Sequence, residues 1–181
     1  MVKATKNSIA KYTVILPRKK KILDVRDYII PTDWKRKRNI AATLTSFSMG
    51  PNSESAVVDS SVLVALFIDG DSNHARAYEI ISAATGHLYV PYIVIEETAS
   101  ILTYRLSKEL AGQFITFIRN DARIVVVDSA VERDMETFLK TQKRISFADI
   151  SIMSVASHMG LKLITFDKQM EREFQKATRT I

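Results

Sequence analysis

The chain contains no cysteine among its 181 residues. This absence excludes disulfide scaffolds, thiolate metal sites, iron–sulfur clusters and a cysteine nucleophile. The five glycines are scattered, so glycine-rich phosphate loops are missing, and there is no Gly-x-Ser-x-Gly elbow. No apolar run approaches the roughly 20 residues of a membrane-spanning helix, and no secretory signal begins the chain. Because 46% of the residues are hydrophobic and 25% are charged, we expect an ordinary globular protein. The lack of cysteine fits a reducing compartment, and we expect the protein to be cytoplasmic.

Charge is distributed unevenly along the chain. Residues 1–48 contain 12 Lys and Arg against 3 Asp and Glu, whereas residues 49–181 contain 14 against 17. We therefore expect a basic extension over residues 1–48 and a mildly acidic domain over residues 49–181. An asymmetry of this kind indicates a nucleic-acid partner.

The extension carries two basic clusters, Arg18–Lys21 and Lys35–Arg38, and Trp34 lies beside the second. One interpretation is an arm that binds phosphates and stacks Trp34 on a base. A solvated, poorly ordered extension explains the same residues, as does a true start at Met49. Tyr12–Leu16 has the composition of a short strand.

The domain alternates short apolar runs with amphipathic segments. We expect strands over residues 56–58, 87–90, 124–127 and 161–166. We expect helices between them and after the last one, with Val131, Met135, Phe138 and Leu139 facing inward on a helix over residues 129–142. Because strands and helices alternate, the predicted fold class is α/β: a short parallel sheet covered on both faces, as in a three-layer α/β/α sandwich.

Carboxylates gather where parallel strands end. Asp59, Asp128 and Asp167 each follow a predicted strand, and Glu97 and Asp149 begin predicted helices. Ligands of such folds bind at the carboxyl ends of the strands. Each acid alone is explained by helix capping, since helices begin at these positions and Ser146 to Asp149 has the spacing of a capping box.

The acids taken together favour a cation site. Asp149 shares a helical face with the apolar residues Ile152, Met153 and Ala156, and no Lys or Arg of the domain obviously pairs with the acids. The three histidines are scattered, and His158 is best explained as a structural residue. An oxygen-rich ligand set suits Mg²⁺, or Mn²⁺, which supports phosphate-ester chemistry.

Four stretches in this order resemble PIN-domain ribonucleases, and in particular the VapC-type toxins of toxin–antitoxin pairs. The resemblance covers about residues 56–175. The stretches are Val57–Leu66, Val90–Leu102, Ile145–Ile150 and Leu163–Asp167.

The resemblance implies a PIN-like sandwich with strand order 3-2-1-4 and a pocket of four acids. Those acids, matched residue by residue, are Asp59, Glu97, Asp149 and Asp167, which would be the catalytic and metal-binding residues. Glu97 is preferred over Glu96 because the glutamate of the family typically falls six residues after a proline, here Pro91. Ser61 matches a small polar residue that often supports the metal-bound water of the family. Asp128 would lie away from the pocket as a cap, and Met153 stands where the family often carries a further acid, which bears on a second metal site.

The resemblance also implies the function. Mg²⁺-activated water would cleave RNA endonucleolytically and leave a 5′-phosphate and a 3′-hydroxyl. Arg105, Lys143 and Arg144 are candidate RNA contacts, although ordinary surface charge explains them as well. A small antitoxin protein and a homodimer are further implied partners.

Three alternatives stay open beside the toxin. A haloacid-dehalogenase-type phosphatase would need a second Asp where Ser61 stands. A PIN fold could instead serve as a non-catalytic RNA- or protein-binding module, although an intact set of four acids argues against this. The same fold could also process or repair ribosomal RNA.

Overall fold

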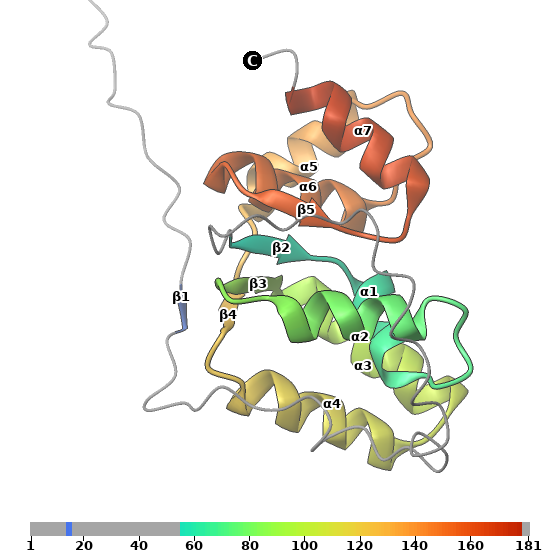
Figure 1. Cartoon of the computed structure of the whole chain (residues 1–181). Coiled ribbons are helices and arrows are strands. Elements are labelled where there is room, and N and C mark those ends of the chain that lie inside the picture. Colours follow the sequence, from blue (N-terminus) through green and yellow to red (C-terminus); the bar gives the residue numbers. More distant parts are fainter. Residues whose placement is uncertain (1–13, 16–54, 179–181) are drawn as a thin grey trace, which may run out of the picture.

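The structure is a computed structural model that describes residues 14–15 and 55–178 (Figure 1). The strands are β1 (Val14–Ile15), β2 (Ala56–Val58), β3 (Leu88–Pro91), β4 (Ile124–Val127) and β5 (Lys162–Ile164). The helices are α1 (Ser60–Phe67), α2 (His74–Ala83), α3 (Tyr92–Arg105), α4 (Lys108–Asn120), α5 (Val131–Lys140), α6 (Phe147–Met159) and α7 (Lys168–Thr178). The predicted alternation of strands and helices is confirmed, and none of these helices is long and apolar enough to cross a membrane.

The strands form one sheet with the order β1-β4-β3-β2-β5. β4, β3, β2 and β5 run parallel to one another. The four predicted strands, numbered 1 to 4 along the chain, are β2, β3, β4 and β5, so their predicted order 3-2-1-4 is confirmed. β1 adds an antiparallel edge strand, with Val14 opposite Val127 and Ile15 opposite Val126. Part of the predicted strand Tyr12–Leu16 is thus a strand. The two basic clusters and Trp34 lie outside the described residues.

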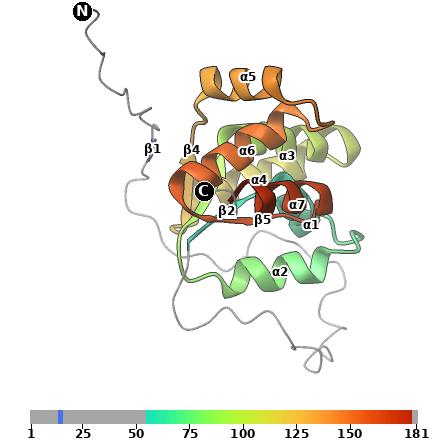
Figure 2. The ribbon, with the colours of Figure 1, turned by 90° about the horizontal axis from the view of Figure 1, so that it is seen from above.

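Helices cover both faces of the sheet. α2 lies on one face, and α5 and α6 lie on the other (Figure 2). All three residues of β2 are buried, as expected for a central parallel strand. Phe114 and Phe117 of α4 are buried, and their rings lie 5.5 and 5.7 Å from the ring of Phe67. The core therefore lies between the sheet and its flanking helices.

The prediction that the apolar side of α5 faces inward is wrong. Val131, Met135, Phe138 and Leu139 are 53%, 47%, 42% and 83% exposed, whereas Asp134 on the same helix is fully buried. α5 packs against α6, where the rings of Phe138 and Phe147 meet at 5.9 Å. The hydrophobic periodicity identified an amphipathic helix, but it carried no information about which side the rest of the fold covers.

The short connection from α6 to β5 determines toward which end of the sheet the N-terminus of α6 lies. Gly160 ends α6 with φ of 65°, a left-handed conformation that glycine adopts without steric cost. The chain then enters β5 almost at once, so the C-terminus of α6 lies near the strand starts. The N-terminus of α6, which carries Asp149, therefore lies toward the carboxyl ends of the parallel strands.

Candidate active site

Asp59 follows β2 and occupies the centre of the candidate site. Its side chain is 4% exposed, and it caps α1 by accepting a hydrogen bond of 2.7 Å from the backbone N–H of Ser60. The hydroxyls of Ser61 and Thr165 donate to its Oδ2 at 2.6 and 2.7 Å. A buried carboxylate is stable only when its oxygens are paired, and these donors meet that requirement.

Ser61 and Thr165 also connect the segments that follow β2 and β5 through hydrogen bonds. The Ser61 hydroxyl accepts from the N–H of Phe166 at 3.0 Å, and the Thr165 hydroxyl accepts from the N–H of Asp167 at 2.9 Å. The N–H of Asp59 in turn donates to the carbonyl of Ile164 at 3.0 Å. Asp59 and Asp167 are therefore joined through a single side chain, Thr165.

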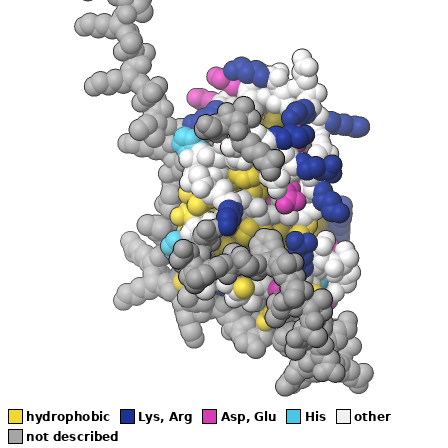
Figure 3. Space-filling view, turned by 45° about the horizontal axis from the view of Figure 1, so that its top comes forward, with side chains coloured by type: hydrophobic (Ala, Val, Ile, Leu, Met, Phe, Trp, Pro, Cys, Tyr) yellow, Lys and Arg dark blue, Asp and Glu magenta, His cyan; other side chains and the backbone are white. Residues whose placement is uncertain are grey.

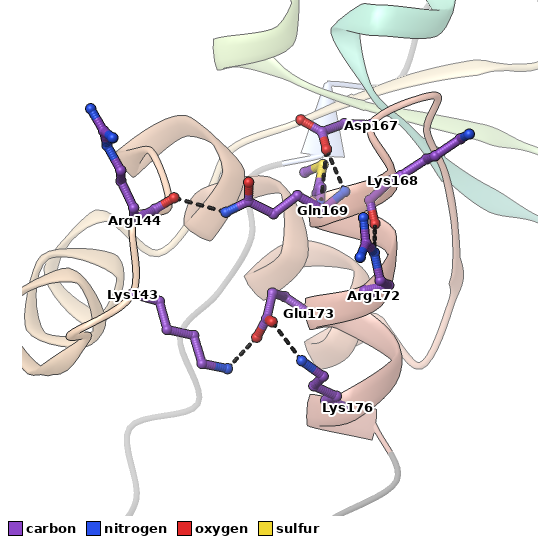
Figure 4. Close-up of polar contacts among 9 residues, drawn as sticks. Lys143, Arg144, Asp167, Lys168, Gln169, Arg172, Glu173 and Lys176 are labelled. Atoms are coloured by element: carbon purple, nitrogen blue, oxygen red, sulfur yellow. Dashed lines mark hydrogen bonds and ion pairs between the residues drawn. The ribbon is translucent and has the colours of Figure 1, made fainter.

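Asp167 is exposed and begins α7. Its Oδ1 accepts from the backbone N–H groups of Gln169 and Met170 at 2.7 and 3.1 Å. The side-chain amide of Gln169 donates to the carbonyl of Arg144 at 2.9 Å (Figure 4). Gln169 therefore connects the turn that holds Asp167 with the segment that leads into α6.

Asp149 lies in the first turn of α6 and forms the predicted capping box. The Ser146 hydroxyl accepts from the N–H of Asp149 at 3.0 Å, and Oδ2 of Asp149 accepts from the N–H of Ser146 at 3.1 Å. The side chain is half-buried, and its Oδ1 accepts no hydrogen bond from a described residue. The capping interpretation is confirmed, and one carboxylate oxygen stays available for another role.

Glu97 lies in the second turn of α3, the helix that starts where β3 ends. Val94, Thr98 and Leu102 form the buried side of this helix. At about 100° per residue, Glu97 lies beside that buried side, whereas Glu96 lies nearly opposite, about 160° from Thr98. Both glutamates are exposed, but Glu97 is the one at the margin of the packed surface.

The fold brings the four acids toward one end of the sheet but does not join them into a completed ligand shell. Asp59 and Asp167 are linked through Thr165, and Glu97 and Asp149 lie on elements that begin at the same end. Among residues 55–178, no three Asp, Glu or His side chains stand close enough to hold a metal ion jointly. The donor chemistry fits Mg²⁺ or Mn²⁺, and metal binding requires the carboxylates to turn toward one another.

Asp128 has no capping role, contrary to expectation. α5 begins after Ala130, which is its cap residue and makes no side-chain cap. Asp128 is exposed at the end of β4, two strands away from β2. Its position away from the candidate site agrees with the sequence interpretation, whereas the cap does not.

Sequence reasoning missed the roles of Thr165 and Arg76. Thr165 lies within one of the family-like stretches, but its contact with Asp59 joins residues 106 positions apart. The guanidinium of Arg76, on α2, lies 5.6 Å from the ring centroid of Phe166, a cation–π contact next to the site. No local pattern signals either contact, because each depends on how distant elements pack.

The basic residues predicted to contact RNA occupy different surroundings. Lys143 forms an ion pair with Glu173, which also pairs with Lys176 at 2.9 Å. The guanidinium of Arg144 points away from α7 (Figure 4). Arg105 lies in the last turn of α3, about 12 Å along the helix from Glu97. RNA contact by these residues stays a prediction.

The chain was compared with protein-family models and with proteins of known sequence and structure. Residues 56–173 match the model of the PIN domain. A solved structure of Mycobacterium tuberculosis VapC20, described as a toxin that cleaves the sarcin–ricin loop, is 22% identical, with a TM-score of 0.61 over 65% of this chain and 94% of that one. VapBC2 from Rickettsia felis, bound to a DNA fragment of its promoter, is 15% identical, with a TM-score of 0.49 over 65% and 92%. No curated protein matched the sequence.

Proposed function

Because the chain belongs to the PIN-domain family, we propose that it is a metal-dependent endoribonuclease and the toxin of a type II toxin–antitoxin pair. The observation that carries the proposal is the paired placement of Asp59 and Asp167, joined through Thr165, at the carboxyl ends of two neighbouring parallel strands. Asp149 and Glu97 lie on elements that begin at the same end of the sheet. Non-catalytic members of an enzyme fold commonly lack one or more of the catalytic residues, whereas all four acids are present here.

The proposed roles follow from chemistry and placement. Asp59, Asp149 and Asp167 would hold Mg²⁺ or Mn²⁺, and Glu97 would hold metal or orient the attacking water. The metal, when bound, would supply an activated water and neutralise charge on the phosphate. Ser61 and Thr165 fix the Asp59 carboxylate, and the N-termini of α1, α6 and α7 favour the negative charges gathered there.

The proposed substrate is RNA, cleaved to a 5′-phosphate and a 3′-hydroxyl. A small antitoxin protein as inhibitor and a homodimer complete the proposal, and both rest on the resemblance to VapC-type toxins. The M. tuberculosis toxin is described as cleaving the sarcin–ricin loop, which makes that loop the first substrate to try.

Cleavage of a mixed RNA pool tests the proposal, with Mg²⁺, with Mn²⁺ and with chelator. We expect metal-dependent cleavage that falls at least about 100-fold in Asp59→Asn and Glu97→Gln. Two matched controls are present in the chain. Glu96→Gln changes the neighbouring acid on the far side of α3, and Asp128→Asn changes a strand-end acid away from the site.

Because Asp59 also caps α1, circular dichroism must show that Asp59→Asn stays folded, and calorimetry must report its metal binding separately. Cleavage that survives equally in Asp59→Asn and Glu97→Gln would contradict the assigned acids. A folded wild-type protein that neither cleaves RNA nor binds metal would favour the non-catalytic PIN module.

A further inference from the structure

Positive charge in the acidic domain is concentrated in its C-terminal part. Residues 55–139 contain 6 Lys and Arg against 12 Asp and Glu, whereas residues 140–178 contain 7 against 4. On the molecular surface, Lys and Arg side chains gather along one side of the molecule (Figure 3). The reversal of charge is therefore local, and it falls on α7 and on the segment that precedes α6.

Three cations form a stripe along α7. Lys168, Arg172 and Lys176 are spaced four residues apart, which places them on one side of the helix. All three are exposed, and they lie on the side away from the buried Met170. The stripe starts one residue after Asp167 and extends about 12 Å along the helix axis. Its first member therefore adjoins the candidate active site.

The segment before α6 lies beside this stripe. The Gln169 amide binds the carbonyl of Arg144, and Glu173 pairs with Lys143 (Figure 4). The hydrogen bonds from Lys143 and Lys176 lower the pKa of Glu173, so that this carboxylate is ionised at neutral pH. Glu173 offsets part of the charge of these two lysines, whereas Lys168, Arg172 and Arg144 form no ion pair with an acid of the described chain.

We propose that the stripe Lys168, Arg172 and Lys176 binds the phosphate backbone of the RNA strand and directs it toward the acids at the carboxyl ends of β2 and β5. This inference rests on the proposed function, and it names the surface that such a substrate follows. An acidic site repels a polyanion, so a cationic surface that begins next to Asp167 supplies attraction at the place where the strand must approach. An acidic protein segment is the competing occupant.

RNA binding by the inactive full-length chain tests the proposal. All proteins carry Asp59→Asn, and the anisotropy of a labelled single-stranded RNA is measured in chelator between 50 and 200 mM salt. The test variant is Lys168→Gln with Arg172→Gln. The control is Lys108→Gln with Arg119→Gln, which removes the same charge from exposed positions on α4, at the opposite end of the molecule from α7 (Figure 1).

We expect the α7 variant to bind RNA more weakly than the control and to depend less on salt. Loss of two phosphate contacts on a single strand lowers the slope of log K against log salt by about 1.4. Over a fourfold change in salt, the parent protein then loses about sevenfold more affinity than the α7 variant. Each single substitution is expected to give about half of this change in slope. If the double variant unfolds, the single variants are measured in its place.

Equal affinity and equal slope for the α7 variant and the α4 control would overturn the proposal. So would a polyaspartate peptide that binds as tightly as RNA and loses the same affinity in the α7 variant, because the stripe would then be a surface for acidic protein. Cleavage by the chain without Asp59→Asn is measured in parallel. If that chain does not cleave while the stripe still governs RNA binding, the proposed function fails and the RNA surface stands.

Discussion

Three of the four acids of the candidate site perform a local structural task. Asp59 caps α1, Asp167 binds the first turn of α7, and Asp149 closes a capping box with Ser146. Capping explains why these residues are Asp without reference to any ligand. It also holds each carboxylate near the positive end of a helix dipole, where an anion is favoured. The same carboxylate can therefore cap a helix and bind a metal ion, and metal-binding experiments decide whether it does both.

Thr165 is the residue through which two of these acids are coupled. Thr165→Val keeps the shape but removes the hydroxyl, which leaves the N–H of Asp167 without its acceptor and Asp59 with one donor fewer. We expect the free energy of unfolding to fall by about 1–3 kcal/mol, because partly buried polar groups lose partners. We also expect a higher metal concentration for half-maximal RNA cleavage. Thr165→Ser retains the hydroxyl and serves as the control.

Urea unfolding and metal titration measure the two effects of Thr165→Val. A valine variant that matches the serine variant in both measurements would show that the hydroxyl does not couple Asp59 to Asp167. A fall in stability without any change in metal dependence would restrict Thr165 to a structural role.

At the level of secondary structure, α5 departs from a stable arrangement in two respects. Its apolar residues Val131, Met135 and Leu139 are exposed, and the carboxylate oxygens of its buried Asp134 have no hydrogen-bond partner among the described residues. A buried charge without a partner is costly, and a buried polar group without one costs about 1–3 kcal/mol. α5 is therefore the helix whose sequence fits its surroundings least.

Replacement of Asp134 tests this conclusion. Asp134→Asn removes the charge at nearly constant volume, and we expect the free energy of unfolding at neutral pH to rise by about 1 kcal/mol or more. Asp128→Asn, at an exposed position just before the same helix, removes a charge at little cost and is the control. A lower stability for Asp134→Asn in thermal unfolding would show that the Asp134 carboxylate has a stabilising partner.

The contrast between α5 and α6 shows what the sequence could predict. The bounds of α6 and its capping box follow from local patterns, since Ser146 and Asp149 are neighbours on the same helical turn. The four parallel strands follow for the same reason, because each is a short apolar run between turn signals. The exposed side of α5 and the role of Thr165 depend on contacts between distant segments, so no local period indicates them. The capping roles of Asp59 and Asp149 were predicted correctly and that of Asp128 was not, whereas the distances between the four acids were not predictable.

For the molecule as a whole, the sheet requires protection along its β4 edge. Edge strands present unpaired N–H and C=O groups that can pair with other chains. β1 covers β4 in antiparallel register, although residues 16–54 separate it from the first residue of the described domain. The extension over residues 1–48 thus contributes a strand to the sheet of the domain.

A chain that begins at Met49 tests the contribution of this strand. It lacks β1, so we expect amide hydrogen exchange at Val126, whose N–H faces β1, to become faster, and we expect unfolding to occur at lower urea concentration. The expected loss is small, about 0.5–1.5 kcal/mol for each hydrogen bond removed, because the described pairing spans only two residues on each strand. A full-length chain in which both basic clusters are changed to Gln retains β1 and controls for the loss of charge. If the shorter chain exchanges and unfolds like the full-length protein, β1 contributes nothing to the domain, and a functional unit that starts at Met49 is favoured.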